Sequence, residues 1–325
     1  MRPSLSILLF TTLSGAGYGL WFVIGVVLAI GEYPEGRGIV LVPLAIGLLL
    51  TSVGLLSSVA HLGQPRRAWR ALSQWRSSWL SREGVAAFLC LPVVFVIAWR
   101  IQSFHDVPKV RLAGVGLAFV AMLTVYCTAR IYSSLRTIPA WHHWRVLPVY
   151  LLLAIQTGGY WLWAVMAWRA DPPREPDGID TAIPWLLALA VTTVASALLK
   201  RGYWRHVDRG ECPATPETAT GLGALGRLRS VEQPHTEANY LTREMGFVVA
   251  RRHSARLRAL ASHLLFSLPL LMLGSVVLFP PMRPLGATIA LASVMLGAFV
   301  ERWLFFAEAR HVVTLFYGAR GEPTR

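Results

Sequence analysis

Charged residues are scarce in this sequence. Only 15% of its 325 residues are Asp, Glu, Lys or Arg, whereas soluble domains carry about a quarter. Hydrophobic residues make up 54% of the chain and come in long runs between short charged stretches. A soluble domain would need more polar surface than this, so the composition excludes an ordinary soluble fold and favours a protein embedded in lipid.

Cysteine is also rare, and its spacing excludes several metal centres. The three cysteines are Cys90, Cys127 and Cys212, and no Cys-x-x-Cys pair occurs. The chain therefore cannot ligate an iron–sulfur cluster by itself, and structural disulfides are not expected. Motifs for dinucleotide, P-loop and HExxH zinc binding are absent as well. The net charge of +14 has no nucleic-acid-binding motif behind it, so no nucleic-acid partner is predicted.

Eight apolar runs are long enough to cross a membrane as helices. A hydrocarbon core about 30 Å thick needs roughly 20 apolar helical residues, and in lipid such a segment must satisfy its own backbone hydrogen bonds. We therefore predict an all-α integral membrane protein, a bundle of eight transmembrane helices that forms a single membrane domain over residues 1–325. The helical pattern of the last run extends as far as residue 317. The eight runs are Leu5–Ile30, Ile39–His61, Val85–Trp99, Leu112–Tyr132, Val146–Trp168, Ile183–Leu199, Leu257–Phe279 and Leu285–Phe306.

The basic residues predict how this bundle is oriented. Eight helices place both termini on one side of the membrane. Of the 31 Lys and Arg residues, 22 fall on that side and six on the other, and the ratio is still 11 to 6 when segment 200–258 is set aside. By the positive-inside rule, both termini are expected in the cytoplasm. Many of the 13 Trp residues lie near predicted helix ends and are expected to anchor the bundle at the lipid headgroups. They include Trp21, Trp69, Trp75, Trp141, Trp144, Trp168 and Trp204.

Residues 200–258 form a long basic loop between predicted helices six and seven, on the predicted cytoplasmic side. Residues 212–226 are rich in Pro, Thr and Gly and predict an irregular loop, whereas residues 237–258 suit a helix capped by Thr236. A solvated linker beside anionic lipid would explain the charge. Apolar and aromatic side chains interleave with the basic ones, however, which favours a docking segment for a cytoplasmic partner.

A histidine and a carboxylate lie near the same predicted membrane face. His61 ends the second run, and Glu83 precedes the third. Arg67 lies between them on an amphipathic stretch that suits a helix lying flat on the membrane. A quinol needs an acceptor for its hydroxyl protons and a quinone needs donors for its carbonyl groups, and His with Glu provides both. Equally, His61 could cap a helix end while Glu83 pairs with Arg82 or Arg67.

Arg130 lies at the predicted cytoplasmic end of the fourth helix. It could pair with Glu83 or contact a lipid headgroup. Snorkelling of a long basic side chain towards the interface would also explain its position.

Ionisable residues also recur near the end of the last run. Glu301, Leu304, Glu308 and His311 follow one another at offsets of three and four, so a continuous helix would place them on one face. Charged groups at membrane depth are costly and are expected to face the bundle interior. They fit a functional role such as a proton relay, and they fit a structural ion-pair network equally well. The candidate partners for such a network are Arg130, Arg302 and Arg310.

Several stretches together carry a family resemblance: His61–Trp69, Leu80–Glu83, Ala129–Tyr132 with Thr137–Trp141, and the last helix through His311. Jointly they resemble the membrane anchor subunit of the dimethyl sulfoxide reductase family of molybdenum enzymes. The resemblance implies eight helices, usually without haem, that exchange electrons between membrane quinone and an iron–sulfur subunit. That subunit in turn serves a molybdopterin subunit. In the family, the positions matching His61 and Glu83 belong to the quinol site, and Arg67 is carried over with them.

A further stretch, Thr236–Phe247, resembles the anchor subunits of membrane-bound sulfite dehydrogenases. That resemblance implies sulfite oxidation in the cytoplasm, coupled to reduction of ubiquinone or menaquinone in the inner membrane of a bacterium. The iron–sulfur and molybdopterin partners would bind at the cytoplasmic face. Quinone is expected at His61 and Glu83. The expected proton relay consists of Arg67, Arg130, Glu301, Glu308 and His311.

Three other functions stay open at this point. One is the anchor of a reductase that oxidises quinol. Another is a haem b cytochrome, which needs paired axial ligands within the bundle, and the candidates are His61, His263 and His311. The third is a secondary transporter. Transporters often show inverted repeats and broken helices, but no convincing repeat is visible here.

Overall fold

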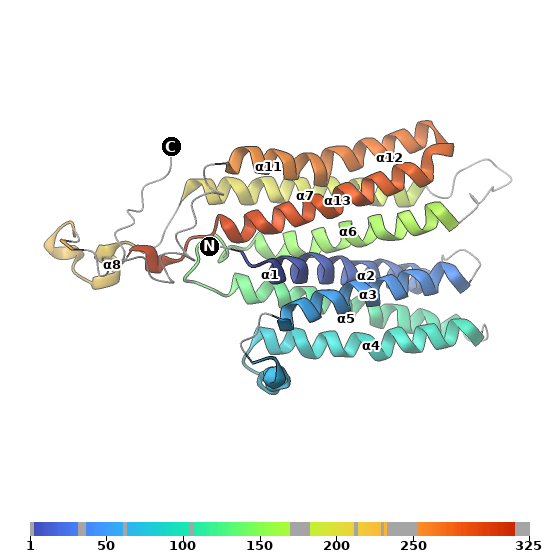
Figure 1. The fold of residues 1–325 in the computed structure, drawn as a ribbon, viewed down its shortest axis with the longest axis horizontal. Helices are drawn as coiled ribbons and strands as arrows, with labels where there is room; N and C mark the ends of the chain where they lie inside the picture. Colours follow the sequence, from blue (N-terminus) through green and yellow to red (C-terminus); the bar gives the residue numbers. More distant parts are fainter. Residues whose placement is uncertain are drawn as a thin grey trace.

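The computed structural model describes residues 3–31, 37–60, 64–103, 107–169, 183–210, 214–228, 231–232 and 253–315. Within these ranges the chain folds as helices that lie side by side along one long axis (Figure 1). Eight of them are long and apolar enough to cross a membrane. The predicted all-α bundle of eight transmembrane helices is therefore confirmed.

The first span combines α1 (Leu5–Leu9), the π-helix η1 (Phe10–Ser14) and α2 (Gly15–Ile30). The hydroxyl of Ser4 caps its start by accepting the Ile7 N–H at 3.4 Å, and Gly31, with φ of 80°, ends it. The next five spans are α3 (Arg37–Ala60), α4 (Trp79–Ser103), α5 (Val107–Ser133), α6 (Val146–Arg169) and α7 (Ile183–Arg209). The seventh combines α11 (Ser254–Ser262), the π-helix η4 (His263–Ser267) and α12 (Leu268–Leu278), and the eighth is α13 (Arg283–Ala307).

Short helical segments join these spans. Among them, η2 lies between α3 and α4, and α8 and η3 lie in the loop that follows α7. The segments are η2 (Pro65–Gln74), α8 (Pro216–Thr220), η3 (Gly223–Leu225), η5 (Pro280–Met282) and η6 (Val312–Leu315).

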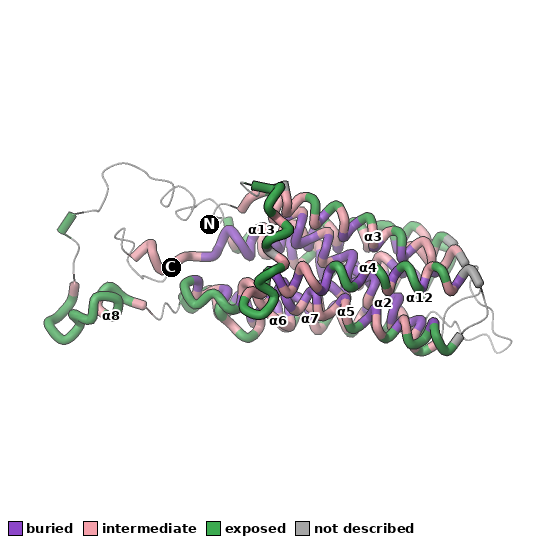
Figure 2. Tube along the Cα trace, turned by 90° about the horizontal axis from the view of Figure 1, so that it is seen from below, coloured by how far each residue is buried: buried purple, intermediate pink, exposed green. Residues whose placement is uncertain are grey.

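The outer surface of the bundle is apolar. Figure 2 shows buried residues along the middle of the bundle and exposed ones along its sides. Large apolar side chains that point outwards include Phe95, Leu112, Leu187 and Leu271. Lipid tails are as apolar as these side chains, so contact with lipid does not drive the helices together, and they associate instead through close packing.

The closest packing occurs where α2 crosses α6. A Cβ atom added to Gly19 would collide with the carbonyl group of Ala154, and one added to Gly158 would collide with the backbone of Gly19. Glycine at both positions lets the two helix backbones touch, as small residues do in membrane bundles. Because α2 also packs on α3 and α5, this crossing lies at the centre of the fold.

The long loop is shorter than predicted. Helix α7 continues to Arg209, and the next span begins at Ser254, so the predicted bounds of 200–258 are wrong at both ends. Lys200, Tyr203 and Trp204 are buried against the bundle, and this packing holds the helix together beyond the apolar run. The irregular loop expected at 212–226 contains the short helix α8. The helix expected at 237–258 lies outside the described residues except for its last turn.

The last helix also ends earlier than predicted. Instead of continuing to residue 317, α13 stops at Ala307. The chain then turns away, and the Val312 N–H donates to the Thr137 carbonyl oxygen at 3.0 Å. This bond ties the segment after α13 to the loop between α5 and α6.

Some of the tryptophans face the interior of the bundle rather than lipid. The Trp21 indole N–H donates to the Leu44 carbonyl at 3.1 Å, and that of Trp141 donates to the Phe305 carbonyl at 3.0 Å. Both rings, and that of Trp204, are buried, so the headgroup-belt prediction is wrong for these three. The indole ring supplies a large apolar body whose N–H finds a partner in the bundle. The rings of Trp69, Trp75, Trp144 and Trp168 are exposed.

Candidate functional site

Glu83 is a buried carboxylate one turn into α4. The residue is 3% exposed, and its Oε1 is hydrogen-bonded to the hydroxyl of Thr128 on α5. The expected alternative, a pair with Arg82, is not made, because Arg82 donates to the backbone carbonyls of Trp75 and Arg76 at 3.0 and 2.7 Å. Burying a carboxyl group is costly unless it is hydrogen-bonded or protonated, so Thr128 is an essential neighbour.

Trp79 and Arg130 lie at the same end of the α4–α5 pair. Trp79 precedes Glu83 by one helical turn, and the Arg130 guanidinium carbon lies 5.1 Å from its ring centroid. Tyr126 meets the same ring edge-on at 5.9 Å. The Nε atom of Arg130 is buried and makes no hydrogen bond within the described part of the chain. A buried donor without a hydrogen-bond partner therefore contacts the tryptophan one turn before Glu83.

Arg67 lies on the short helix η2, which runs across the end of the bundle rather than along it (Figure 1). The predicted amphipathic helix is therefore present, in 3₁₀ form. Arg67, Trp69 and Trp75 are all exposed on it. The residue between α3 and η2 that the sequence singles out, His61, lies outside the described residues. Of the predicted set, Glu83 on α4 and Arg130 on α5 lie on neighbouring helices, and no hydrogen bond or ion pair joins them in the described structure.

A second charged group lies between α7 and α13. Glu301 is fully buried and its Oε1 pairs with the Lys200 ammonium group, whose side chain is 1% exposed. Arg302 Nη1 lies 3.4 Å from Glu301 Oε2, at ion-pair distance but without hydrogen-bond geometry. The Arg302 guanidinium also stacks over the ring of Tyr150, at 3.6 Å. Of the predicted partners of Glu301, Arg302 is therefore correct, and Lys200 was missed because it was assigned to the loop.

Glu301 and Glu308 share a face, because Glu308 caps α13 in right-handed helical geometry and its N–H donates to the Leu304 carbonyl at 2.9 Å. Glu308 accepts from Arg258 Nε at 2.8 Å, and Arg258 Nη1 reaches Asp208 at 2.6 Å. Burial raises the pKa of Glu308, and the Arg258 guanidinium opposes that rise. His311 lies beyond the helix, and its Nδ1 accepts the Val313 N–H at 3.0 Å. The stripe predicted from helical spacing is therefore wrong for His311, and the two carboxylates belong to separate ion-pair networks.

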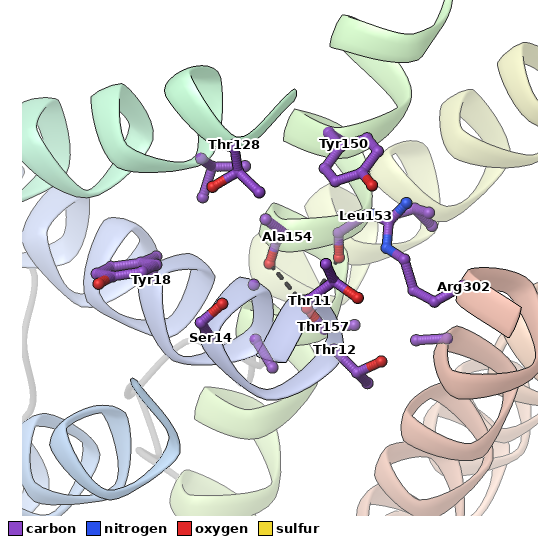
Figure 3. Close-up of a pocket in the computed structure, with 14 residues that line it drawn as sticks. Thr11, Thr12, Ser14, Tyr18, Thr128, Tyr150, Leu153, Ala154, Thr157 and Arg302 are labelled. Carbon is purple, nitrogen blue, oxygen red and sulfur yellow. Dashed lines mark hydrogen bonds between the residues drawn. The ribbon is translucent and has the colours of Figure 1, made fainter. Parts of the chain in front are cut away.

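The first span contributes hydroxyl groups that the sequence analysis did not single out. Thr12, Tyr18 and Tyr150 line a small pocket together with Thr128 and Arg302 (Figure 3). Ser and Thr are common in membrane helices, because their hydroxyls can bond to the preceding turn. Helical spacing alone therefore does not distinguish these residues from structural ones.

The remaining haem candidates do not meet inside the bundle. His263 is exposed on η4, and His311 lies beyond the end of α13. Within the described residues, no group of three or more His, Cys, Asp or Glu side chains is arranged to hold a metal ion.

Known proteins match the chain along almost its whole length. The family model described as DMSO reductase anchor subunit (DmsC) matches residues 1–319. A sulfite dehydrogenase subunit of Allochromatium vinosum is 31% identical over 334 residues, which cover 98% of this chain and 99% of that protein. An anaerobic dimethyl sulfoxide reductase subunit of Haemophilus influenzae is 26% identical, over 62% of this chain and 71% of that protein. A subunit of anaerobic dimethyl sulfoxide reductase from Escherichia coli is 28% identical, over 46% of this chain and 52% of that protein.

No solved structure matches the chain. The family assignment therefore comes from sequence, and the eight membrane-spanning helices agree with it. The chain is an integral membrane protein, and it belongs to the family of dimethyl sulfoxide reductase anchor subunits.

Proposed function

We propose that this chain is the quinone-reactive anchor of a molybdenum enzyme that oxidises sulfite. It would pass electrons from an iron–sulfur subunit, docked on the cytoplasmic face, to quinone in a bacterial inner membrane. The similarity to the sulfite dehydrogenase subunit over 98% of the chain is the observation that favours sulfite as the substrate of the complex. The buried Glu83 at one end of the bundle supports the quinone site.

The residues around Glu83 suit a quinone headgroup. A quinone bound there would accept two electrons and two protons. Glu83 can hold a proton on its carboxyl group within the bundle, where Thr128 fixes its orientation. Arg130 Nε is a buried donor without a partner in the described structure, which suits it to a carbonyl oxygen. Trp79 would form one side of the site, and His61 would supply a second donor.

The loop between α7 and α11 would dock the iron–sulfur partner. In its described part, Leu222, Leu225 and Val231 are all exposed, the last at 96%. Large apolar side chains that are exposed to water on one loop suit a binding surface. Leu225→Asp with Val231→Asp is expected to release the soluble subunits without changing the amount of anchor in the membrane.

Purification of the tagged chain from its native membrane in mild detergent tests the function. We expect two co-purifying soluble subunits, with molybdenum and iron in the eluate, and sulfite-dependent reduction of a soluble ubiquinone analogue. Fusing a reporter active only in the cytoplasm to each terminus tests the orientation. An eluate that contains the soluble subunits but reduces no quinone with sulfite would refute the substrate.

A second candidate is a reductase that oxidises quinol. The similarity to dimethyl sulfoxide reductase subunits of two bacteria favours it. The same eluate would then oxidise a reduced quinone analogue when dimethyl sulfoxide is added, and sulfite would have no effect.

A further inference from the structure

A small pocket lies inside the bundle, next to the Glu83 site, and polar side chains form part of its lining. Its walls come from η1, α2, α5, α6 and α13, and Figure 3 shows the side chains that line it. The π-helix η1 contributes Thr11, Thr12 and Ser14. A π-helical turn within an α-helical span is rare and frequently marks a functional site. The hydroxyls of Thr11 and Ser14 donate to backbone carbonyls of the preceding turn, which leaves the Thr12 hydroxyl for the pocket.

Three polar atoms of the residues around this pocket are buried without a hydrogen-bond partner in the described structure. They are Thr12 Oγ1, the hydroxyl of Tyr150 and Arg302 Nη1. Leaving a buried polar atom unpaired is costly, and such atoms are few in native proteins. Three around one pocket therefore indicate a polar occupant that bonds to them after small side-chain movements.

The size of the pocket selects that occupant. The space open to the centre of a water molecule is about 20 Å³, which is room for about one ordered water. A quinone ring does not fit this volume. Hydroxyl groups and a guanidinium group together offer both donors and acceptors, as a buried water requires.

The pocket connects two groups of buried charge. Thr128 lines it and is hydrogen-bonded to Glu83. Arg302 lines its other side and contacts Glu301, which pairs with Lys200. The pocket thus lies between the two groups of buried charge.

We propose that this pocket binds ordered water and that the water returns protons to Glu83 through Thr128. The water site stands on the pocket alone, whereas the proton role rests on the proposed quinone function. For each proton that Glu83 gives to a quinone oxygen, one proton moves from the pocket water to Glu83, and the water recovers one from bulk solvent. The two electrons come from the iron–sulfur partner.

The water itself is tested by cryo-electron microscopy of the purified complex, at a resolution that shows ordered waters. We expect a density peak within hydrogen-bond distance of Tyr150 and Arg302. Tyr150→Phe removes one partner and is expected to remove or shift that peak. An empty pocket in a well-resolved map would overturn the water site, whatever the complex does with quinone.

The proton role is tested by rate. Tyr150→Phe and Thr12→Val keep the shape of the pocket and remove one hydroxyl each. We expect each variant to slow quinone reduction about tenfold and to raise the ratio of the rates in H₂O and D₂O. The loss of rate is smaller than the ~10²–10⁴-fold contributed by a positioned acid, because each variant removes only one of several polar groups. Tyr160→Phe is the matched control, because Tyr160 is equally buried but bonds to Thr193 outside the pocket, at 3.1 Å.

The outcomes separate this proposal from the proposed function. A wild-type complex that reduces no quinone, but shows the density peak, would refute the function and the proton role and leave the water site standing. A complex that reduces quinone equally fast in the pocket variants and in Tyr160→Phe would overturn the proton role alone. Loss of soluble subunits or metal from a variant is checked first, so that a folding defect is not mistaken for slow transfer.

Discussion

Lys200 and Glu301 lie 101 residues apart in the sequence and form an ion pair inside the bundle. Lys200 lies on α7 and Glu301 on α13, and their side chains are 1% and 0% exposed. Arg302 lies beside them, with its Nη1 3.4 Å from Glu301 Oε2. Two cations therefore share one carboxylate where water is excluded. Removing the carboxylate should lower the stability of the protein more than removing one of the cations.

The Glu301→Gln variant should be much less stable than the Lys200→Met variant. Glu301→Gln leaves Lys200 and Arg302 as two buried cations without an anion, and breaking a buried pair costs about 3–5 kcal/mol. Lys200→Met leaves Glu301 paired with Arg302, so a smaller loss is expected. Thermal unfolding of each purified variant in the same detergent measures the difference.

Arg201→Met is the control for this comparison, because Arg201 is the exposed neighbour of Lys200 on α7. It should change the unfolding temperature little. If Lys200→Met proved as damaging as Glu301→Gln, Arg302 would not neutralise Glu301, and the three-charge description would be incorrect.

The eight spans could be predicted from sequence because a bilayer sets both their length and their helical form. Their ends could not. Helix α4 begins at Trp79 rather than Val85, since its first turns are polar and hydropathy does not register them. Helix α7 continues past Lys200 because a partner 101 residues away neutralises that charge. Contacts between distant segments therefore decided the boundaries that local patterns missed.

The site could be predicted only in part, because residue type identifies a candidate but does not show which side chains of other helices contact it. A carboxyl group near a membrane helix end is rare, so Glu83 could be singled out from its residue type alone. Its neighbour Thr128 could not, because a hydroxyl in a helix gives no sign of which neighbouring helix it faces. The predicted grouping of His311 with Glu301 and Glu308 extended helical spacing beyond Glu308, which caps the end of the helix.

Glu83→Gln should slow quinone reduction by at least about 100-fold, since a positioned proton donor contributes about 10²–10⁴-fold. Gln keeps the size of the side chain and its bond to Thr128, but it cannot carry the proton. The rate is measured in the intact complex with sulfite and a soluble quinone analogue. Tyr160→Phe is the control and should retain the full rate, because Tyr160 bonds to Thr193 away from this site. Full activity in a Glu83→Gln, His61→Ala double variant would place the quinone site elsewhere.

Gly158→Ala should destabilise the bundle, whereas Gly274→Ala should not. A Cβ at Gly158 would meet the backbone of Gly19, but one at Gly274 would meet nothing within 4 Å. Backbone cannot move aside as a flexible side chain can, so α2 and α6 must separate, and overpacking of this kind costs about 1–3 kcal/mol. Thermal unfolding of the two variants, and their yield in the membrane, gives the comparison. Equal stability would mean that the two helices do not cross at these glycines.

Arg258→Met should destabilise the end of the bundle more at pH 8 than at pH 5. Burial raises the pKa of Glu308, and the Arg258 guanidinium, with Lys200 further away, opposes the rise, while Asp208 adds to it. Without Arg258, the folded state holds the Glu308 proton more tightly than the unfolded state does. Stability is then greatest below the unfolded pKa of Glu308 and falls as pH rises through the higher folded pKa.

Unfolding temperatures of wild type and Arg258→Met, measured across this pH range, check the prediction about Glu308. Arg256→Met is the matched control, because Arg256 lies on the same helix α11 but is exposed, so its variant should follow the wild type at every pH. Adding Glu308→Gln to Arg258→Met should abolish the extra loss at pH 8, since an amide has no charge to leave uncompensated. A pH dependence that survives in this double variant would assign the effect to Asp208, which also bonds to Arg258 and is 61% exposed.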